Sequence, residues 1–128
     1  MKHLAAIALG GALGALCRHL TNQVCSRYFT QAGHFPWSTL VVNVVGCFLI
    51  GLIITLRTAE SHFWDDVTHS ALTIGFLGAL TTFSTFGFET NSLFTSQQHG
   101  LGLLNIAGNM LVGLLAVYGG IEVGRWLS

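Results

Sequence analysis

Gly75-Phe-Leu-Gly-Ala-Leu-Thr-Thr-Phe-Ser-Thr-Phe-Gly87 is the stretch that decides the fold, because it lies in the middle of an uncharged segment long enough to span a membrane. Its glycines, β-branched threonines and four hydroxyl groups make a poor lipid-facing helix. Non-helical backbone at membrane depth persists only where it is buried in protein or lines a water-filled cavity, because lipid cannot satisfy a free N–H or C=O group. The stretch therefore predicts a third membrane span that is broken at its centre, with an ion or substrate site at the break.

The whole chain has the composition of a membrane protein. Of its 128 residues, 52% are hydrophobic and 8% are charged, and its mean hydropathy is +0.65. A helix needs about 20 predominantly apolar residues to cross the hydrocarbon core. Four segments are long enough, at residues 4 to about 24, 37–56, 71–88 and 101–121. Since four spans leave only short connectors, we expect one all-α transmembrane domain over residues 1–128.

The charges are few and balanced, with five basic and five acidic residues. This balance argues against a nucleic-acid partner, which requires a basic surface. With four spans, Lys2, Arg57 and Arg125 share one side of the membrane, and Arg18 and Arg27 lie on the other. Three basic residues against two give almost no orientation bias. The chain is therefore predicted to insert both ways and to pair as an antiparallel, dual-topology homodimer about an axis in the membrane plane.

Small residues recur at helical spacing in the first and fourth spans. Gly10 and Gly14 are four residues apart, and so are Gly120 and Gly124. Such pairs let two helices approach closely in a membrane. The pattern alone leaves two interpretations open, packing within the bundle or a homodimer interface.

Amide side chains lie inside two of the predicted spans. Asn43 is near the centre of the second span, with Thr39 one turn earlier on the same face, and Asn105 and Asn109 share one face of the fourth span. A buried amide costs free energy unless it is paired. These residues are therefore either interhelical hydrogen-bonding glue or part of a functional site.

The third span adds aromatic rings and hydroxyl groups. Phe83 and Phe86 are three residues apart and share a face, while Ser84 and Thr85 lie on adjoining faces. Phenylalanines at this spacing serve either packing or function. Amide and hydroxyl donors combined with positive ring edges suit an anion that accepts hydrogen bonds. No acidic residue lies inside the spans, which argues against proton-coupled export of cations.

Three segments together resemble the signature segments of the Fluc (CrcB-type) fluoride channel family, and the resemblance covers essentially the whole chain. They are Gly10-Gly-Ala-Leu-Gly-Ala-Leu-Cys-Arg18, Ser38-Thr-Leu-Val-Val-Asn-Val-Val-Gly-Cys-Phe-Leu-Ile-Gly51 and the stretch from Gly75 to Phe86. The resemblance implies a dual-topology homodimer with two fluoride pores, each lined by both subunits. It also implies a structural sodium ion at the dimer centre, held by the backbone carbonyls of Gly78 and Thr81.

The same resemblance assigns roles to individual side chains. Asn43 would donate to fluoride, Phe83 and Phe86 would present ring edges to it, and Ser84 and Thr85 would belong to a polar track. The predicted pore set is completed by Thr39, Asn105 and Asn109, and the predicted vestibule residues are Arg18 and Glu89. Asn105 and Asn109 stand where many family members carry tyrosine and serine, so the hydrogen bonding along the track is expected to differ here.

The implied function is passive, selective export of fluoride from the cytoplasm, across the bacterial cytoplasmic (inner) membrane, by a multi-pass, lipid-embedded protein that is not an enzyme. Two alternatives remain at this point. A small proton-coupled multidrug or cation exporter would need a carboxylate in the first span, which offers only Arg18. A structural subunit of a larger membrane complex would use the asparagines as glue and would leave the broken helix unexplained.

Overall fold

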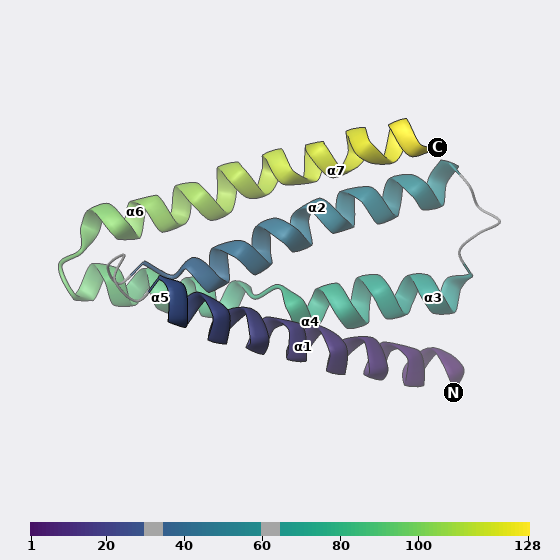
Figure 1. The fold of residues 1–128 in the computed structure, drawn as a ribbon, viewed down its shortest axis with the longest axis horizontal. Helices are drawn as coiled ribbons and strands as arrows, with labels where there is room; N and C mark the ends of the chain where they lie inside the picture. Colours follow the sequence, from purple (N-terminus) through teal and green to yellow (C-terminus); the bar gives the residue numbers. More distant parts are fainter. Residues whose placement is uncertain (30–34, 60–64) are drawn as a thin grey trace.

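The computed structural model describes residues 1–29, 35–59 and 65–128, and every regular element in these ranges is a helix (Figure 1). In chain order the elements are α1 (Lys2–Tyr28), α2 (Trp37–Ala59), α3 (Asp66–Ser70), η1 (Ala71–Leu77), α4 (Gly78–Leu80), α5 (Phe83–Thr95), α6 (His99–Ala107), η2 (Gly108–Val112) and α7 (Gly113–Leu127). The segments η1 and η2 have the wider turns of a π-helix and lie within longer helical runs.

Four of the described helical stretches are long and apolar enough to cross a membrane, namely Lys2–Tyr28, Trp37–Thr58, Asp66–Thr95 and His99–Leu127. They form an elongated bundle with both termini at the same end (Figure 1). The predicted all-α membrane protein with four spans is confirmed, and the chain is a multi-pass membrane protein. Each helix extends beyond its predicted span at one end or both, because polar residues outside the hydrocarbon core continue the helix.

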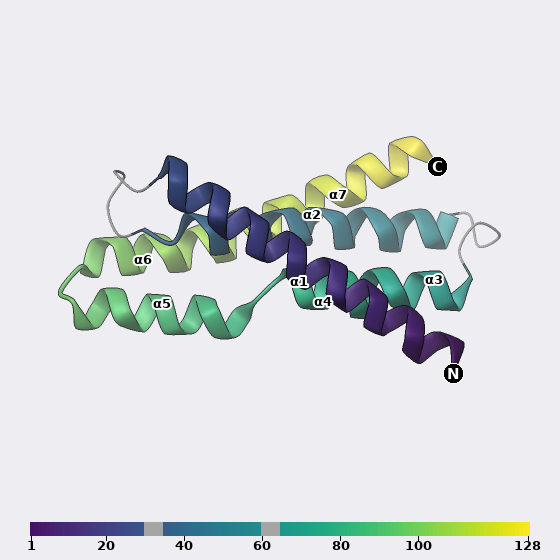
Figure 2. The ribbon, with the colours of Figure 1, turned by 60° about the horizontal axis from the view of Figure 1, so that its bottom comes forward.

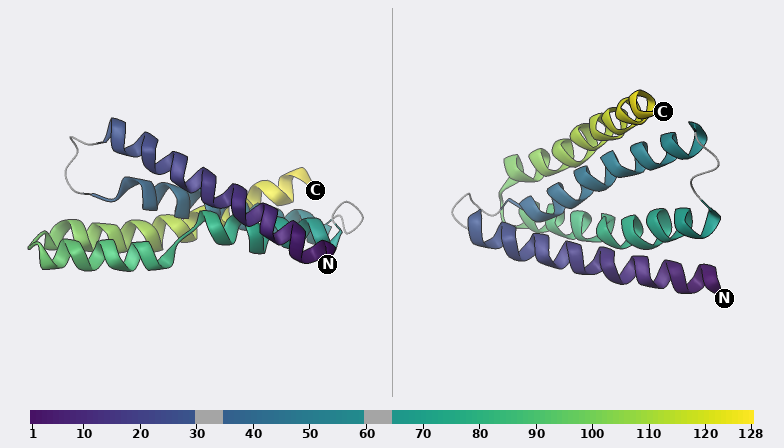
Figure 3. Two further views of the ribbon diagram at one scale, coloured as in Figure 1. Left: turned by 90° about the horizontal axis from the view of Figure 1, so that it is seen from below. Right: turned by 45° about the vertical axis from the view of Figure 1, so that its right-hand side comes forward.

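The glycines of the first span hold α1 against the third helical run, which α1 crosses obliquely (Figures 2 and 3). A Cβ atom on Gly10 or Gly14 would collide with the backbone carbonyls of Ala71 and Phe76. On the opposite helix, a Cβ on Gly75 would lie 2.5 Å from the carbonyl oxygen of Ile7. The two helix backbones are therefore in direct contact, as small residues in membrane helices allow.

The same device joins α2 to α7. A Cβ atom on Gly120 would collide with the carbonyl of Phe48, and one on Gly124 would lie 2.8 Å from the Cβ of Thr55. Both glycine pairs identified in the sequence thus pack inside one chain. Of the two interpretations that the sequence left open, packing within the bundle is the one that the contacts bear out.

Helical backbone stops in the middle of the third span. α4 ends at Leu80 and α5 begins at Phe83, and the two residues between them are extended, with ψ 155° at Thr81 and φ −151° at Thr82. They are the sixteenth and seventeenth of the 30 residues in the span Asp66–Thr95. Figure 2 shows this connection as a short non-helical segment between α4 and α5. It follows directly after Leu80, which forms a buried apolar cluster with Val42 and Leu77.

A tight turn reverses the chain between α5 and α6. The N–H of Gln98 donates to the carbonyl of Leu93 at 2.8 Å, and the N–H of Gln97 donates to the carbonyl of Phe94 at 3.1 Å. This is the Schellman pattern of helix termination, in which glycine usually takes the left-handed position. Here Gln97 takes it with φ 63°, so the turn carries backbone strain that glycine would not have.

Candidate functional site

Thr82 is the centre of the hydrogen bonding at the non-helical segment. Its side chain is buried, and its hydroxyl accepts from the N–H of Thr85 at 3.2 Å, which is the bond of a helix N-cap. The same hydroxyl donates to Oγ1 of Thr85 at 2.9 Å and lies 3.3 Å from the hydroxyl of Ser84. Sequence reasoning named Ser84 and Thr85 and missed Thr82, although a threonine directly before a helix is a known N-cap signal.

Asn43, on α2, fastens its side chain to the backbone of Thr82. The N–H of Thr82 donates to Oδ1 of Asn43 at 2.9 Å. The amide nitrogen of Asn43 donates to Oδ1 of Asn109 at 2.8 Å and lies 3.4 Å from the carbonyl of Thr82. One amide N–H is therefore firmly bonded, and the other has only a contact at the outer limit of hydrogen bonding. That second N–H is the one available to a ligand.

Asn105 and Asn109 are part of the same hydrogen-bond system. The amide nitrogen of Asn109 donates to Oδ1 of Asn105 at 2.9 Å and to the backbone carbonyl of Asn105 at 3.0 Å. The amide nitrogen of Asn105 donates to the hydroxyl of Thr90 at 2.9 Å, and this hydroxyl donates to the carbonyl of Phe86 at 2.7 Å. Sequence reasoning missed Thr90, because nothing in the sequence shows that α5 and α6 bring these residues together.

A cavity of about 380 Å³, here called the central pocket, lies beside this system. Its lining includes Asn43, Thr82, Phe83, Phe86 and Asn109. The two phenylalanine rings have centroids 5.5 Å apart and planes at 49°. Phe86 is buried, whereas Phe83 is 77% exposed in the single chain. Asn105 is completely buried and does not line any of the three pockets described in this section.

Gly78 and Thr81 also line the central pocket, and their carbonyls have lost their usual helical partners. In a continuous helix the N–H of Thr82 would bond to the Gly78 carbonyl, and the N–H of Thr85 to the Thr81 carbonyl. Both N–H groups are instead directed to side chains, one to Asn43 and the other to the Thr82 hydroxyl. Two carbonyl oxygens are thus free to bind a hard cation, which prefers oxygen ligands.

A smaller cavity of about 190 Å³, the entrance pocket, lies on the other side of Thr82. Its lining includes the two predicted vestibule residues, Arg18 and Glu89, and two predicted pore residues, Thr39 and Thr85. Thr82 lines both this pocket and the central one. Oxygen Oε2 of Glu89 is buried without a hydrogen-bond partner among the described residues.

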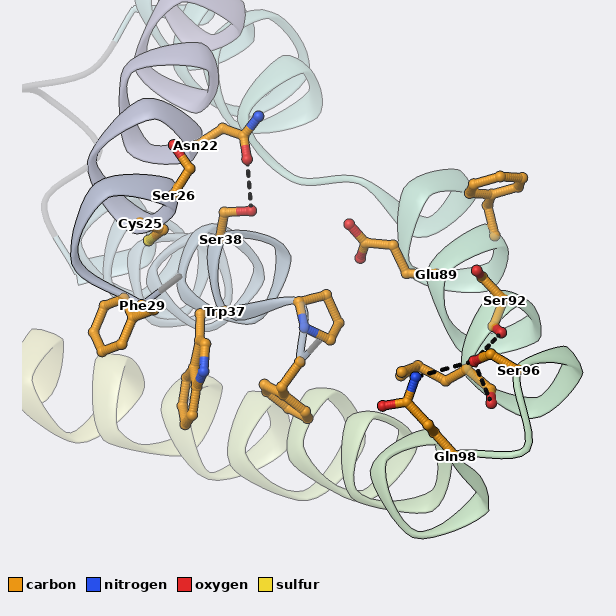
Figure 4. Close-up of a pocket in the computed structure, with 14 residues that line it drawn as sticks. Asn22, Cys25, Ser26, Phe29, Trp37, Ser38, Glu89, Ser92, Ser96 and Gln98 are labelled. Carbon is orange, nitrogen blue, oxygen red and sulfur yellow. Dashed lines mark hydrogen bonds between the residues drawn. The ribbon is translucent and has the colours of Figure 1, made fainter. Parts of the chain in front are cut away.

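The largest of the three cavities described here, about 590 Å³, lies beside the entrance pocket, between α1, α2 and α5 (Figure 4). The two share Asn22, Ser38 and Glu89, and the Ser38 hydroxyl donates to Oδ1 of Asn22 at 3.0 Å. In Figure 4 the Glu89 side chain points from α5 into this cavity. The largest of the three cavities thus shares lining residues with the entrance pocket, and the entrance pocket shares Thr82 with the central pocket.

The ends of the two half-helices carry opposite partial charges. α5 is 13 residues long, and its N-terminus, at Phe83, presents free N–H groups and the positive end of the helix dipole. The run that ends at Leu80 presents free carbonyls and the negative end. The interruption thus places the partially positive end of one half-helix next to the partially negative end of the other.

Comparisons with known proteins find relatives along nearly the whole chain. Residues 5–121 match the family described as CrcB-like protein, Camphor Resistance (CrcB). The chain is 46% identical over 123 residues to the fluoride-specific ion channel FluC of Hydrogenovibrio crunogenus, covering 95% of this chain and 90% of that protein. It is 41% identical over 119 residues to the protein of the same name from Maridesulfovibrio salexigens, covering 93% and 92% of the two chains. It is also 43% identical over 129 residues to fluoride-specific ion channel FluC 2 of Nocardia farcinica, covering 98% and 86%.

Proposed function

The chain belongs to the CrcB-like family of fluoride channels and is not an enzyme, and from this membership we propose that it conducts fluoride passively and selectively. The observation that carries the proposal is the set of donors at the N-terminus of α5. Asn43 offers an N–H group beside the rings of Phe83 and Phe86 in the central pocket, and Ser84 and Thr85 add hydroxyl groups in the first turn of α5.

Fluoride is small and strongly hydrated, so a pore must replace its water with close, directed donors. Amide and hydroxyl groups supply such donors, and phenylalanine rings supply the positive edge of their quadrupole. The dipole of α5 adds a fixed positive potential at the same point. In this arrangement Arg18, Thr39 and Glu89 form the vestibule through which the anion reaches the central pocket, with Asn109 beside Asn43.

We further propose that the single chain is half of the channel. Phe83 is 77% exposed although it belongs to the predicted pore, and a second copy in the opposite orientation would cover it. Such an antiparallel homodimer has two equivalent pores, each completed by side chains of both copies. Both orientations of the chain in the membrane are expected because the basic residues on the two sides are nearly balanced.

A sodium ion at the dimer centre fits the residues present, because Gly78 and Thr81 have carbonyl oxygens without helical partners. The two carbonyls of each copy would hold it. When bound, the ion supplies a fixed positive charge near the two anion paths. The chain itself keeps these carbonyls without helical hydrogen bonds, because the N–H groups of Thr82 and Thr85 donate to side chains instead.

The remaining expectations belong to the same proposal. The 128 residues act as one transmembrane domain in the bacterial cytoplasmic membrane, and fluoride leaves the cytoplasm down its gradient. The relatives quoted above are named ion channels, which favours this function over proton-coupled export and over a purely structural subunit.

The decisive test is fluoride efflux from liposomes that contain the purified protein, measured with a fluoride electrode. We expect efflux without a proton gradient and much slower efflux of chloride. Drug or proton exchange in place of fluoride efflux would support an exporter, and no transport would support a structural subunit. A reporter fused after Ser128 should appear on both sides of the membrane, and a single orientation with full conduction would exclude the antiparallel dimer.

A further inference from the structure

The hydrogen bonds around Asn43 form one continuous relay, defined here as Thr82, Asn43, Asn109, Asn105, Thr90 and the carbonyl of Phe86. Each member donates to the next, at distances between 2.7 and 2.9 Å. The relay leaves α5 at Thr82, passes through α2, η2 and α6, and returns to α5 one and two turns later. It therefore ties three separate parts of the chain into a ring.

The direction of this relay is fixed at both ends. It begins at a backbone N–H, which can only donate, and it ends at a backbone carbonyl, which can only accept. Between these ends are three carboxamides, and each can be turned so that its oxygen and nitrogen exchange places. With both ends fixed, only one arrangement of the three amides leaves every link with a donor and an acceptor. In that arrangement Asn43 turns its oxygen to Thr82 and its nitrogen toward Asn109 and the central pocket.

We propose that Thr90 and Asn105 are positioning residues, which act through Asn109 to keep the donating side of the Asn43 amide turned toward the permeating anion. Neither residue lines the described pockets, and Asn105 is completely buried. We expect them to affect transport by fixing which atom of each amide donates and which accepts. The proposal rests on the proposed function for its consequence, but the relay itself is a property of the chain.

Substitutions at Thr90 can separate the contribution of the relay from that of ordinary packing. Valine has the shape of threonine but no hydroxyl, so Thr90→Val preserves packing and leaves the Asn105 amide without its acceptor. If Asn105 then turns, its nitrogen faces the nitrogen of Asn109, which also donates to the backbone carbonyl of Asn105 at 3.0 Å. Asn109 then loses its side-chain acceptor, and if it turns in response the conflict is passed on to Asn43. Serine keeps the hydroxyl and loses only the methyl group, so Thr90→Ser preserves the relay and damages packing.

The experiment compares fluoride efflux of the two Thr90 variants with that of the parent in the same liposomes. We expect Thr90→Ser to retain most of the flux and Thr90→Val to lose about tenfold, the usual weight of one hydrogen bond to a charged group. Unchanged flux in Thr90→Val, or equal losses in both variants, would overturn the proposal. If Thr90→Val does not fold, the double variant Asn105→Leu with Thr90→Val removes both buried polar partners, and its flux should remain low. Parental flux in that variant would likewise overturn the proposal.

A second measurement does not depend on transport. In protein labelled with ¹⁵N-asparagine, the carboxamide resonance of Asn43 is identified by its absence from Asn43→Ser. We expect this resonance to move in Thr90→Val and to stay in place in Thr90→Ser, although Asn43 and Thr90 are three links apart. A resonance unmoved in both variants would refute the relay even if the parent conducts fluoride. A parent that conducts no fluoride, with a resonance that moves as expected, would refute the function and leave the relay standing.

Discussion

Replacing Gly75 by alanine tests the contact that holds the third helical run against α1. A Cβ atom on Gly75 would lie 2.5 Å from the carbonyl oxygen of Ile7, 3.1 Å from the nitrogen of Gly11 and 3.2 Å from Cα of Gly10. Ordinary contact begins at 3.4 Å. All three neighbours are backbone atoms that cannot rotate away, so α1 and η1 must separate by about 1 Å, which forfeits a quarter to a half of their contact energy.

The expected cost follows from two opposing terms. Overpacking costs about 1–3 kcal/mol, and a backbone clash belongs at the upper end of that range. Alanine is a better helix former than glycine by about 1 kcal/mol. We therefore expect Gly75→Ala to lower the free energy of unfolding by about 2 kcal/mol.

The matched control lies on the facing helix. In Gly11→Ala the new Cβ meets only the carbonyl of Gly75, at 3.8 Å, so this variant keeps the gain in helix propensity without the clash. The free energy of unfolding is measured in detergent micelles by far-UV circular dichroism, at two protein concentrations that separate chain folding from dimer dissociation. Equal stability of Gly75→Ala and Gly11→Ala would refute the reasoning.

Three further predictions concern the site and the turn. In Asn43→Leu the N–H of Thr82 and Oδ1 of Asn109 lose their partner, which costs about 1–3 kcal/mol of stability each, and fluoride efflux should be lost. Asn43→Ser should keep part of the efflux. Parental efflux in both variants would show that the amide serves only helix packing. Phe83→Ile and Phe86→Ile should each reduce efflux sharply, with the smaller loss of stability at the exposed Phe83; unimpaired efflux in both would exclude a role for the ring edges. Gln97→Gly should raise the free energy of unfolding by about 1 kcal/mol, because glycine adopts φ 63° without strain, and a less stable variant would contradict the strain assigned to that turn.

Hydropathy was enough to predict the four spans, because the lipid core requires a minimum apolar length whatever the packing. It could not give their ends, since α3 and the last turns of α5 are polar and lie beyond that length. The glycine pairs predicted close helix contact but not its partner. Gly10 could face another copy or η1 with the same sequence, and the choice depends on how α1 crosses the bundle.

The candidate site was only partly readable from the sequence, for a similar reason. Asn43, Phe83 and Phe86 could be singled out because an amide or a paired ring stands out in an apolar span. Thr82 was missed although a threonine directly before a helix is an N-cap signal, and Thr90 could not be singled out because a hydroxyl inside a helix commonly bonds to its own backbone. Their roles depend on partners 39 and 15 residues away in the chain. Only the packing of α2 and α6 on α5 supplies those partners.

Asn105 and Asn109 are one helical turn apart but have different surroundings in the structure. They lie on one face, four residues apart, and both were predicted to belong to the pore. In the structure Asn109 reaches the central pocket and bonds to Asn43, while Asn105 is sealed behind it and bonds to Thr90. The contact of Asn105 with an anion thus remains a prediction, whereas its contact with Asn109 is part of the fold.

The two extended residues explain why carbonyl groups and N–H groups without helical partners occur next to each other in this protein. Helical backbone that stops at Leu80 leaves carbonyls without partners, and backbone that restarts at Phe83 leaves N–H groups free. At membrane depth neither set can turn to lipid. Asn43 and the Thr82 hydroxyl satisfy two of the N–H groups, and by doing so they prevent the Gly78 and Thr81 carbonyls from recovering a helical bond. The side chains that satisfy the N–H groups at the start of α5 are therefore the same ones that keep the Gly78 and Thr81 carbonyls without helical partners.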